Sequence, residues 1–516
     1  MKISIIDIGS NTIKLVIYDV REDNSFAGIH QESTKVKLGE SLAFSDNLSE
    51  ESILKSIDVL LLYRDITRLE SVNNVVCVGT SAVRDSKNGK YFVDQVLKKT
   101  GFKVRVLSGE EEAYYSYLGA SMATCIPNGL FFDLGGGSLE LVYAEDFKVK
   151  KAQALPLGAL RLSRTFASQD GSFSKKDCDN MTQKIMDTLP TKKIYGIGID
   201  ASLVGAGGTL RALGRVDQKR AGFPFEKVHN YRLKLTTIES LRKDLSNLKP
   251  SEISNRYPFD STRVETIVAG IYVIHGIMKK FDFDEIIISG HGIREGLLAS
   301  YIHGPSILEN HNIESLEKQV TKLLSYNCHK QDISNFGLDD MVHDMIYYGM
   351  LKEREVEILS YALYTLSTMP ATNKYYGLFY RLLDEDYPQL TYREQIILAL
   401  SIIYSKKIRI GEELFRKYNH LLKPQNLKSL QKIALLLNLA RILLKTRSWI
   451  KIKQTENKNV IFTIIPNQKS FPGILLKQIM EKANRIFDVP VQCNIVDKTD
   501  QTKNSINKTI SLKSHL

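Results

Sequence analysis

Residues 133–138 read Asp-Leu-Gly-Gly-Gly-Ser, and residues 7–12 carry a shorter version of this phrase, Asp-Ile-Gly-Ser-Asn-Thr. Each phrase follows a short apolar run, at residues 3–6 and 130–132, and precedes a second run of strand type. This order predicts a β-hairpin whose glycine-rich tip exposes backbone N–H groups. A backbone without Cβ atoms approaches phosphate oxygens closely. One copy could be a plain turn, but two copies predict two similar lobes that face each other across a phosphate-binding cleft.

The bulk composition is that of a reduced, globular, multidomain protein. The 516 residues exceed one domain, since domains have about 150 residues, and 43% hydrophobic with 25% charged residues is ordinary globular composition. The N-terminus shows no apolar leader, and no apolar stretch reaches the roughly 18 residues that span a membrane. The five cysteines are scattered and never in CxxC spacing. We therefore expect a cytoplasmic protein without disulfides, zinc or membrane attachment.

The positive charge is concentrated at the C-terminal end. Residues 401–516 carry 22 lysines and arginines against 7 acids, a surplus of +15, while residues 1–400 sum to −3. Such a region is often only a solvated face, but beside a phosphate cleft it favours a long polyanion as partner. Nucleic acid is less favoured, because the region lacks zinc-finger spacing, a basic zipper or interleaved aromatic residues.

The pattern of apolar residues divides the chain into four parts. Strand-like and helical segments alternate through residues 1–124 and again through residues 125–304, which predicts two α/β lobes. Helical periodicity then dominates residues 305–446. Residues 447–516 are expected to form a small basic α+β unit that ends in a mobile tail at residues 497–516.

Four further phrases carry groups suited to phosphoryl transfer. They are Gly-Thr-Ser-Ala-Val-Arg at residues 79–84, Ser-Gly-Glu-Glu-Glu-Ala at 108–113, Gly-Ala-Gly-Gly-Thr at 205–209 and Ser-Gly-His-Gly-Ile-Arg-Glu-Gly at 289–296. Backbone N–H groups and an arginine would surround the phosphate, carboxylates would hold metal, and one base would activate water. The Walker and Rossmann glycine patterns are both absent, so this is not a P-loop protein.

Together the six phrases resemble the exopolyphosphatase / guanosine pentaphosphate phosphatase (Ppx/GppA) family. The resemblance covers roughly residues 1–302, with the phrases in the family's order. It places the chain in the superfamily of actin, sugar kinases and heat-shock chaperone ATPases. It implies two ribonuclease-H-like lobes with the active site between them, and hydrolysis of a terminal phosphate by water, usually with Mg²⁺.

The resemblance also assigns the catalytic groups. Glu112 would position and deprotonate the attacking water, and Arg84 would bind the terminal phosphate. Helical spacing separates Glu112 from Glu110 and Glu111, so only one of the three should face the cleft. Without the other phrases, the three acids would be favourable charges in a first helical turn.

The remaining site residues follow from the same resemblance. Those that would bind phosphate are Asp7, Ser10 and Asn11 in the first loop, Gly135, Gly136, Gly137 and Ser138 in the second, and Gly208 and Thr209 in the loop that holds adenosine in ATP-using relatives. Asp133 and Glu140 are the expected ligands of Mg²⁺, a hard cation that often uses only one or two carboxylates. Arg294 and Glu295 are either a packing ion pair or a substrate contact.

The helical part raises a separate question. In longer members of the family this region resembles an HD-type phosphohydrolase domain, whose metal site needs spaced histidines and an adjacent His-Asp pair. The helix expected to carry that pair, at residues 361–367, has neither residue, and the pair His343-Asp344 precedes it without obvious further ligands. We interpret residues 305–446 as an all-helical, HD-like domain without metal ligands, used for binding or dimerisation.

The favoured function is that of an exopolyphosphatase that releases phosphate from the ends of inorganic polyphosphate, working as a homodimer. Hydrolysis of the 5′ γ-phosphate of guanosine pentaphosphate (pppGpp) is the alternative, since the catalytic phrases do not distinguish the two substrates. A nucleotide-binding sensor that has lost catalysis is disfavoured by the presence of both Glu112 and Arg84. An ATP-dependent kinase is disfavoured because a water-activating glutamate would be wasteful there.

Overall fold

The computed structural model describes residues 1–21, 26–223, 227–303, 338–368, 374–385, 387, 390–455, 459–466, 472–487 and 490–495. The chain forms two compact units, residues 1–328 and 329–516. The expected tail at residues 497–516 and Cys328 lie outside the described residues. No helix within the described ranges is long and apolar enough to cross a membrane.

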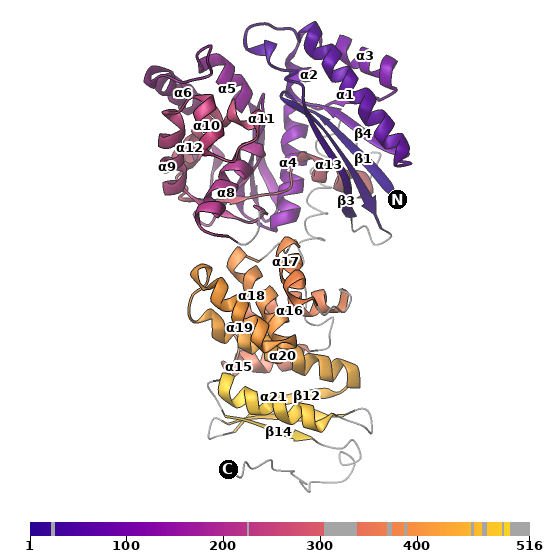
Figure 1. Ribbon diagram of the computed structural model, residues 1–516, viewed down its shortest axis with the longest axis vertical. Coiled ribbons are helices and arrows are strands. Elements are labelled where there is room, and N and C mark those ends of the chain that lie inside the picture. Colours follow the sequence, from indigo (N-terminus) through magenta and orange to yellow (C-terminus); the bar gives the residue numbers. More distant parts are fainter. Residues whose placement is uncertain are drawn as a thin grey trace. The chain divides into compact units, whose positions relative to one another are not determined.

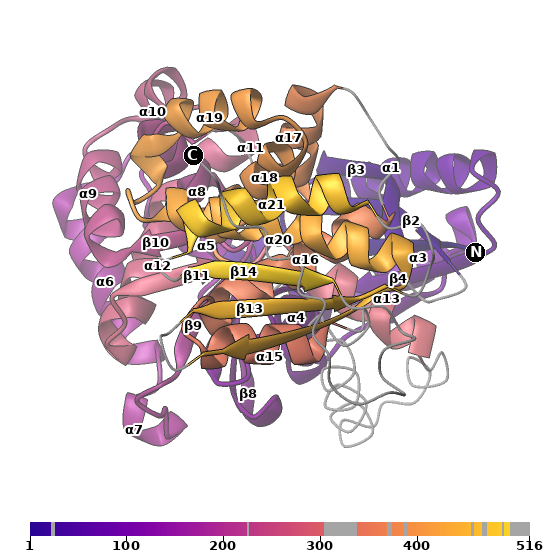
Figure 2. The same cartoon turned by 90° about the horizontal axis from the view of Figure 1, so that it is seen from below.

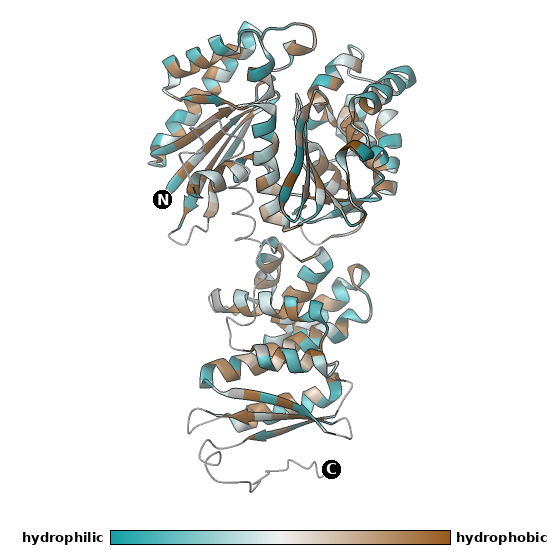
Figure 3. Ribbon diagram, turned by 180° about the vertical axis from the view of Figure 1, so that it is seen from behind, coloured by the Kyte–Doolittle hydropathy of each residue, from teal (hydrophilic) through white to brown (hydrophobic). Residues whose placement is uncertain are grey.

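The first lobe of unit 1 is an α/β layer built on a hairpin. It consists of β1 (Lys2–Ile8), β2 (Thr12–Val20), β3 (Phe26–Lys35), η1 (Ser41–Ala43), α1 (Glu50–Leu69), β4 (Asn74–Gly79), α2 (Ser81–Asp85), α3 (Gly89–Thr100) and β5 (Val104–Val106). The sheet order is β3-β2-β1-β4-β5, with β2 antiparallel and β4 parallel to β1. Apolar residues run along these strands (Figure 3) and bury a continuous core beneath α1 and α3. The first predicted hairpin is therefore confirmed.

The second lobe repeats this plan. It consists of β6 (Gly129–Leu134), β7 (Leu139–Glu145), β8 (Lys148–Leu155), α5 (Ala159–Phe166), α6 (Lys175–Thr188), α7 (Lys192–Tyr195), β9 (Ser202–Ala206), α8 (Gly208–Arg220), β10 (Arg232–Lys234), α9 (Leu235–Ser246), α10 (Pro250–Arg256), α11 (Ser261–Val264), α12 (Ile267–Phe281) and β11 (Glu285–Ile288). Its sheet order is β10-β11-β9-β6-β7-β8, so β8-β7-β6-β9-β11 matches β3-β2-β1-β4-β5 with one edge strand added. The duplicated α/β architecture expected from the two hairpins is confirmed.

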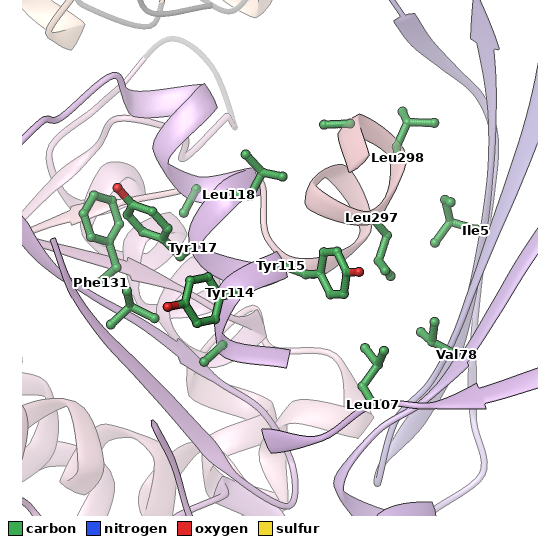
Figure 4. Packing of buried hydrophobic residues seen from close by; sticks show 14 of the residues in the cluster. Ile5, Val78, Leu107, Tyr114, Tyr115, Tyr117, Leu118, Phe131, Leu297 and Leu298 are labelled. Carbon is green, nitrogen blue, oxygen red and sulfur yellow. The ribbon is translucent and has the colours of Figure 1, made fainter. Parts of the chain in front are cut away.

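Two helices, α4 (Gly109–Thr124) and α13 (Ile293–His303), lie between the two sheets (Figure 1). In Figure 4, Tyr115 of α4 and Leu297 of α13 lie on the side of the first sheet, near Ile5 and Val78, whereas Tyr117 lies against Phe131 of the second sheet. Tyr117 and Phe131 meet edge to face, with ring centroids 4.8 Å apart. One apolar core thus joins both lobes, and α4 packs largely on the second sheet although the lobe boundary was expected at residue 124. That boundary stays a prediction.

The crossing of α4 and α13 is unusually close because it is made by glycines. A Cβ on Gly119 would collide with the carbonyl oxygen of Gly292, and one on Gly296 with that of Tyr115. Close backbone contact at this crossing holds the start of α4, where the three glutamates lie, in a fixed position between the sheets.

Unit 2 contains the expected helices followed by a small α+β layer. The elements are α15 (Asp339–Tyr347), α16 (Glu353–Thr368), α17 (Tyr375–Asp384), α18 (Tyr392–Lys406), α19 (Ile408–Lys417), η4 (Asn419–Leu421), α20 (Asn426–Thr446), β12 (Trp449–Gln454), β13 (Val460–Ile465), α21 (Gly473–Ile486) and β14 (Val491–Ile495). Figure 2 shows the three strands side by side in the order β12-β13-β14, with α21 along the sheet. The likeness of the helices to an HD domain stays a prediction.

Candidate active site

The tips of the two hairpins have the same backbone turn. In the first tip the N–H of Gly9 donates to the carbonyl of Thr12 at 3.1 Å, and in the second the N–H of Gly135 donates to that of Ser138 at 3.1 Å. Strand register matches as well: Asp7 lies opposite Lys14 across the first hairpin, and Asp133 lies opposite Glu140 across the second. The repeated phrases thus build two equivalent loops, each with a cross-strand charged pair at its base.

The two tips face each other at close range. A Cβ on Gly137 would collide with the hydroxyl oxygens of Ser10 and Ser81, and one on Gly136 would lie 3.3 Å from the Cβ of Asn11. The glycines of the second tip therefore leave just enough room for the first tip and for the start of α2. The cleft predicted between two lobes is present in the structure.

A polar cavity of about 110 Å³ lies between the tips. The predicted residues in its wall are Asp7, Ser10, Asn11, Glu112, Asp133, Gly135, Gly136, Gly137, Ser138, Glu140 and Gly208. These residues come from four of the six phrases, which are far apart in the sequence, yet they surround a single space. The cavity is of the size that a phosphate group and a few water molecules occupy, and its wall is mostly polar.

Glu112 is the only one of the three adjacent glutamates in this wall, as helical spacing predicts. Glu111 instead completes the predicted capping box with Ser108 and pairs with Arg105, while Glu110 is exposed. Burial raises the pKa of Glu112 to about 7, even though the neighbouring Arg84 favours its ionised form. A carboxylate with that pKa is suited to take a proton near neutral pH.

Arg84 reaches the site through Glu112 and does not itself line the cavity. Its Nη1 donates to Glu112 Oε2 at 2.7 Å and to the carbonyl of Leu107 at 3.1 Å. Its Nε donates to Asp85, which also accepts from Arg161 of the second lobe at 2.9 Å. The structure therefore places Arg84 where it orients Glu112, and its expected contact with a terminal phosphate stays a prediction.

The second hairpin supplies two carboxylates, of which Glu140 is buried and Asp133 half-buried. Burial raises the pKa of Asp133, against the attraction of Lys14 and Arg211 and a hydrogen bond from Ser116. Burial, with repulsion from Glu112 and Asp133, raises the pKa of Glu140 well above its usual value. Among the described residues, Glu140 Oε1 has no hydrogen-bond partner. A bound cation would offset both the repulsion between these carboxylates and the cost of desolvating their charges.

Several residues of the wall were missed by the sequence analysis. Lys14 is half-buried near Asp7 and Asp133, and desolvation together with Arg294 lowers its pKa to about 8. Thr80 and Ser81 come from a phrase in which only Arg84 had been selected. Ser116 and Arg263 also line the cavity. A comparison of the two hairpins would have found Lys14, because it follows Asp7 by the same interval that separates Glu140 from Asp133.

Three residues proposed near the site lie behind its wall. Thr209 is fully buried and does not line the cavity, but its hydroxyl accepts a hydrogen bond at 3.4 Å from Arg263, which does. Glu295 accepts from the Tyr18 hydroxyl at 2.7 Å and from the N–H of Gly292 at 2.9 Å. Burial would raise the pKa of Glu295, but Arg294, His291 and these donors lower it to about 2. Arg294 attracts Glu295 electrostatically, but its Nη1 is buried without a hydrogen-bond partner among the described residues, so both the packing ion pair and the substrate contact stay predictions.

The fold thus consists of two α/β lobes, with glycine loops around a small polar cavity and a buried glutamate in its wall. A profile of the Ppx/GppA phosphatase family matches residues 16–304, more than half of the chain. The chain belongs to the Ppx/GppA phosphatase family, as its six phrases indicated.

The relatives in this family differ in their named activities. The bifunctional 3-dehydroquinate synthase/phosphatase of Fusobacterium nucleatum is 29% identical over 310 residues, which are 58% of this chain but only 46% of that protein. Exopolyphosphatase 1 of Mycobacterium bovis is 24% identical over 62% of this chain and 95% of its own. The guanosine-5′-triphosphate,3′-diphosphate pyrophosphatase of Vibrio atlanticus is 28% identical over 57% of each chain.

Solved structures agree with the family assignment. An exopolyphosphatase from Cytophaga hutchinsonii superposes with a TM-score of 0.55 at 26% identity, covering 59% of this chain and 98% of that one. The Ppx/GppA family member of Aquifex aeolicus gives a TM-score of 0.50 at 28% identity, covering 60% and 99%. Both cover little more than half of this chain, so they support the α/β fold and not the arrangement of the rest.

Proposed function

We propose that this protein is an exopolyphosphatase that hydrolyses the terminal phosphoanhydride bond of inorganic polyphosphate, with Glu112 as general base. One observation carries the proposal. Glu112 lies in the wall of the polar cavity between the hairpin tips, with its pKa raised to about 7 by burial and one oxygen held by Arg84 at 2.7 Å. Its other oxygen, Oε1, is left to accept a proton from water.

The chemistry requires one proton acceptor and a site for the phosphate. Water attacks the terminal phosphorus, a new P–O bond forms, and the bond to the bridging oxygen breaks. Glu112 takes the proton of the attacking water, and the shortened chain leaves with its terminal oxygen anionic. Arg84 fixes the direction of the Glu112 carboxylate, and positioning of this kind supplies much of the catalysis in phosphoryl transfer.

The hairpin tips supply the phosphate site. Their exposed backbone N–H groups and the hydroxyls of Ser10, Ser81 and Ser138 surround the cavity. Lys14 adds a positive charge at its base, since below pH about 8 the amine is protonated. Donors fixed in place by folding stabilise developing negative charge without reorganisation during the reaction.

The residues of the cavity fit a divalent cation such as Mg²⁺. Asp7, Asp133, Glu112 and Glu140 all line the cavity, and Glu140 Oε1 is buried without a hydrogen-bond partner among the described residues. In the described part of the chain, no group of three or more acids, histidines or cysteines is close enough to hold a metal by itself. Asp133 and Glu140 would therefore hold the ion together with phosphate oxygens and water, and the ion would neutralise phosphate charge.

The charge distribution favours the polymer over pppGpp as substrate. Residues 401–516 carry the surplus of +15, whereas residues 1–400 sum to −3. A long polyanion interacts with many cations at once, whereas pppGpp presents few charges beyond the cleft. Hydrolysis of pppGpp is retained as the second candidate, because the Vibrio atlanticus relative is named for that activity.

A single assay tests the proposal. Phosphate release is measured from triphosphate, long-chain polyphosphate and pppGpp, each with and without Mg²⁺, for the wild-type protein and Glu112→Gln. We expect the largest kcat/KM on long polyphosphate, dependence on Mg²⁺, and loss of all three activities in the variant. A preference for pppGpp would replace the substrate, and Glu112→Gln with full turnover would overturn the mechanism.

A further inference from the structure

A second cavity in the described part of the chain lies in unit 2 and has no place in the proposed hydrolysis. It encloses about 580 Å³, against about 110 Å³ for the cleft between the hairpin tips. Sites for small organic ligands generally enclose about 300–1,000 Å³. The cavity therefore has room for a ligand much larger than a phosphate group.

Two neighbouring helices, α20 and α21, supply most of the wall. The lining positions on α20 recur every three or four residues from Gln431 to Thr446, and those on α21 do so from Leu475 to Ile486, so each helix presents one face. The end of α18 and the start of α19 close the remaining side. The apolar lining is aliphatic, and consists mainly of Ile408, Leu435, Ile442, Leu475, Ile479 and Ile486.

The charged groups in this wall have one sign. They are Lys406, Arg441, Lys445 and Lys482, and no acid is among the described residues that line the cavity. Within the described ranges, none of the four has a recorded ion pair. Burial and the nearby Arg441 lower the pKa of Lys406, so the cations repel one another in the absence of an anion. An aliphatic interior with an uncompensated cationic rim is complementary to an amphipathic anion.

We propose that unit 2 binds a single-chain acyl anion, with the chain between α20 and α21 and the carboxylate or phosphate head among Arg441, Lys445 and Lys482. The site is separate from the proposed hydrolysis and does not depend on it. Some of the cations in the C-terminal region, whose surplus is +15, would then bind the acyl anion in addition to polyphosphate.

The chemistry of the wall argues against other occupants. Polyphosphate has no apolar part and would leave the aliphatic lining exposed to water. A nucleotide base binds through aromatic stacking, yet Tyr404 is the only aromatic residue in the described lining. The chain's own residues 496–516 carry four lysines against two aspartates, so their charge has the wrong sign for this cavity.

The test is a titration of the full-length protein with a fluorescent long-chain fatty carboxylate. We expect saturable binding at one site, displaced by dodecanoate at a concentration about tenfold below that needed for dodecanol, as one charge-assisted hydrogen bond provides. Triphosphate, which is confined to the cleft of unit 1, should not displace the probe. Equal displacement by dodecanoate and dodecanol, or displacement by triphosphate, would overturn the proposal.

Two matched pairs of variants on α21 locate the site. Leu475 and Ile474 are both exposed, at 49% and 81%, but only Leu475 lines the cavity. Leu475→Gln should weaken binding of the probe about tenfold while Ile474→Gln leaves it unchanged, since only Leu475 would lose apolar contact with the acyl chain. Likewise Lys482→Gln should weaken binding and Lys477→Gln should not. Circular dichroism first confirms that all four variants fold.

Two other outcomes would also overturn the proposal. One is binding of the protein to phosphatidylglycerol vesicles without any binding of the free carboxylate, which would assign the cavity to a membrane surface. The other is loss of probe binding when the protein self-associates at higher concentration, measured by sedimentation. That result would show that a second copy of the chain fills the cavity.

Discussion

The two hairpins of unit 1 have the same backbone and opposite charge at one position. Asp7 lies opposite Lys14 in the first hairpin, and Asp133 lies opposite Glu140 in the second. The tip turns are closed by the same hydrogen bond, from Gly9 to Thr12 and from Gly135 to Ser138. A duplicated scaffold has thus placed a half-buried lysine on one side of the cleft and a buried glutamate at the equivalent point on the other.

The difference separates two tasks that a phosphatase must combine. In the proposed reaction the amine of Lys14 would attract the anionic phosphate, while the carboxylates of Asp133 and Glu140 would hold the cation that accompanies it. The first tip adds the side chains of Ser10 and Asn11, whereas Gly136 and Gly137 of the second tip leave room for them. Neither hairpin supplies the proposed base, which comes from α4 between the sheets.

The largest expected effect tests whether the base indeed lies outside both hairpins. Glu112→Gln should lower kcat about 10²–10⁴-fold while polyphosphate binding is retained, because removal of a positioned base leaves ground-state contacts in place. Phosphate release and equilibrium binding of polyphosphate are measured together. Glu110→Gln is the matched control, since Glu110 lies on the same helical turn but is exposed. Near-normal turnover of Glu112→Gln would move the search for the base to Glu140.

The second prediction separates the two hairpins by their charges. Lys14→Met should raise KM roughly ten- to hundredfold at any Mg²⁺ concentration, since a hydrogen bond to a charged group contributes about 1.5–3 kcal/mol. Glu140→Gln should instead raise the Mg²⁺ concentration needed for half-maximal activity about tenfold, with a smaller effect at saturating Mg²⁺. Steady-state kinetics over a grid of substrate and Mg²⁺ concentrations measures both.

An exposed lysine provides the control for Lys14→Met. Lys55→Met on α1 removes a lysine charge outside the cavity and should leave both parameters unchanged. If Lys14→Met and Glu140→Gln shift the Mg²⁺ dependence equally, the two hairpins do not divide their tasks by charge.

The pH dependence offers a finer test of the same division. Glu112 must be deprotonated to act as base, and its pKa of about 7 predicts that kcat/KM rises with pH up to about 7. Lys14 must be protonated to attract phosphate, and its pKa of about 8 predicts that kcat/KM falls above pH about 8. The wild-type profile should therefore be bell-shaped.

Lys14→Met should lose the alkaline limb of this profile and keep the acidic one. Because both proteins share the substrate, ionisation of the phosphate cancels in this comparison, and an unchanged alkaline limb would remove Lys14 from the site.

Much of this arrangement could be predicted from local sequence. The repeated Asp-x-Gly phrases between strand-like runs predicted both hairpins. Ser108, three residues before Glu111, predicted where α4 begins and therefore which way Glu112 points. These features depend on residues close together in sequence, where spacing determines geometry. The structure also confirms that the second lobe repeats the strand order of the first.

The rest depended on packing that no local pattern records. Arg263 lies on α11, far from any phrase, and lines the cavity because the second lobe folds it there. Arg84 was selected from its phrase, yet Thr80 and Ser81 of that phrase line the cavity and Arg84 turns to Glu112. The aliphatic cavity of unit 2 likewise arises from two helix faces whose partners are set only by tertiary contact.

The smallest expected effect concerns unit 2, and it asks whether the two hairpins suffice for the chemistry. If they do, residues 1–328 alone should hydrolyse triphosphate within about twofold of the full chain, because every group of the cleft belongs to unit 1. Such a truncation is reasonable, since the Mycobacterium bovis relative is covered over 95% of its length by only 62% of this chain.

For long polyphosphate the truncation should raise KM and flatten its dependence on salt, because binding of a polyanion by many cations releases condensed counterions. Circular dichroism and sedimentation establish first that the truncated protein folds and does not aggregate through newly exposed apolar surface. Equal loss of activity on short and long chains would show that the hairpins need unit 2, and unchanged relative efficiency would leave the basic region as a solvated face.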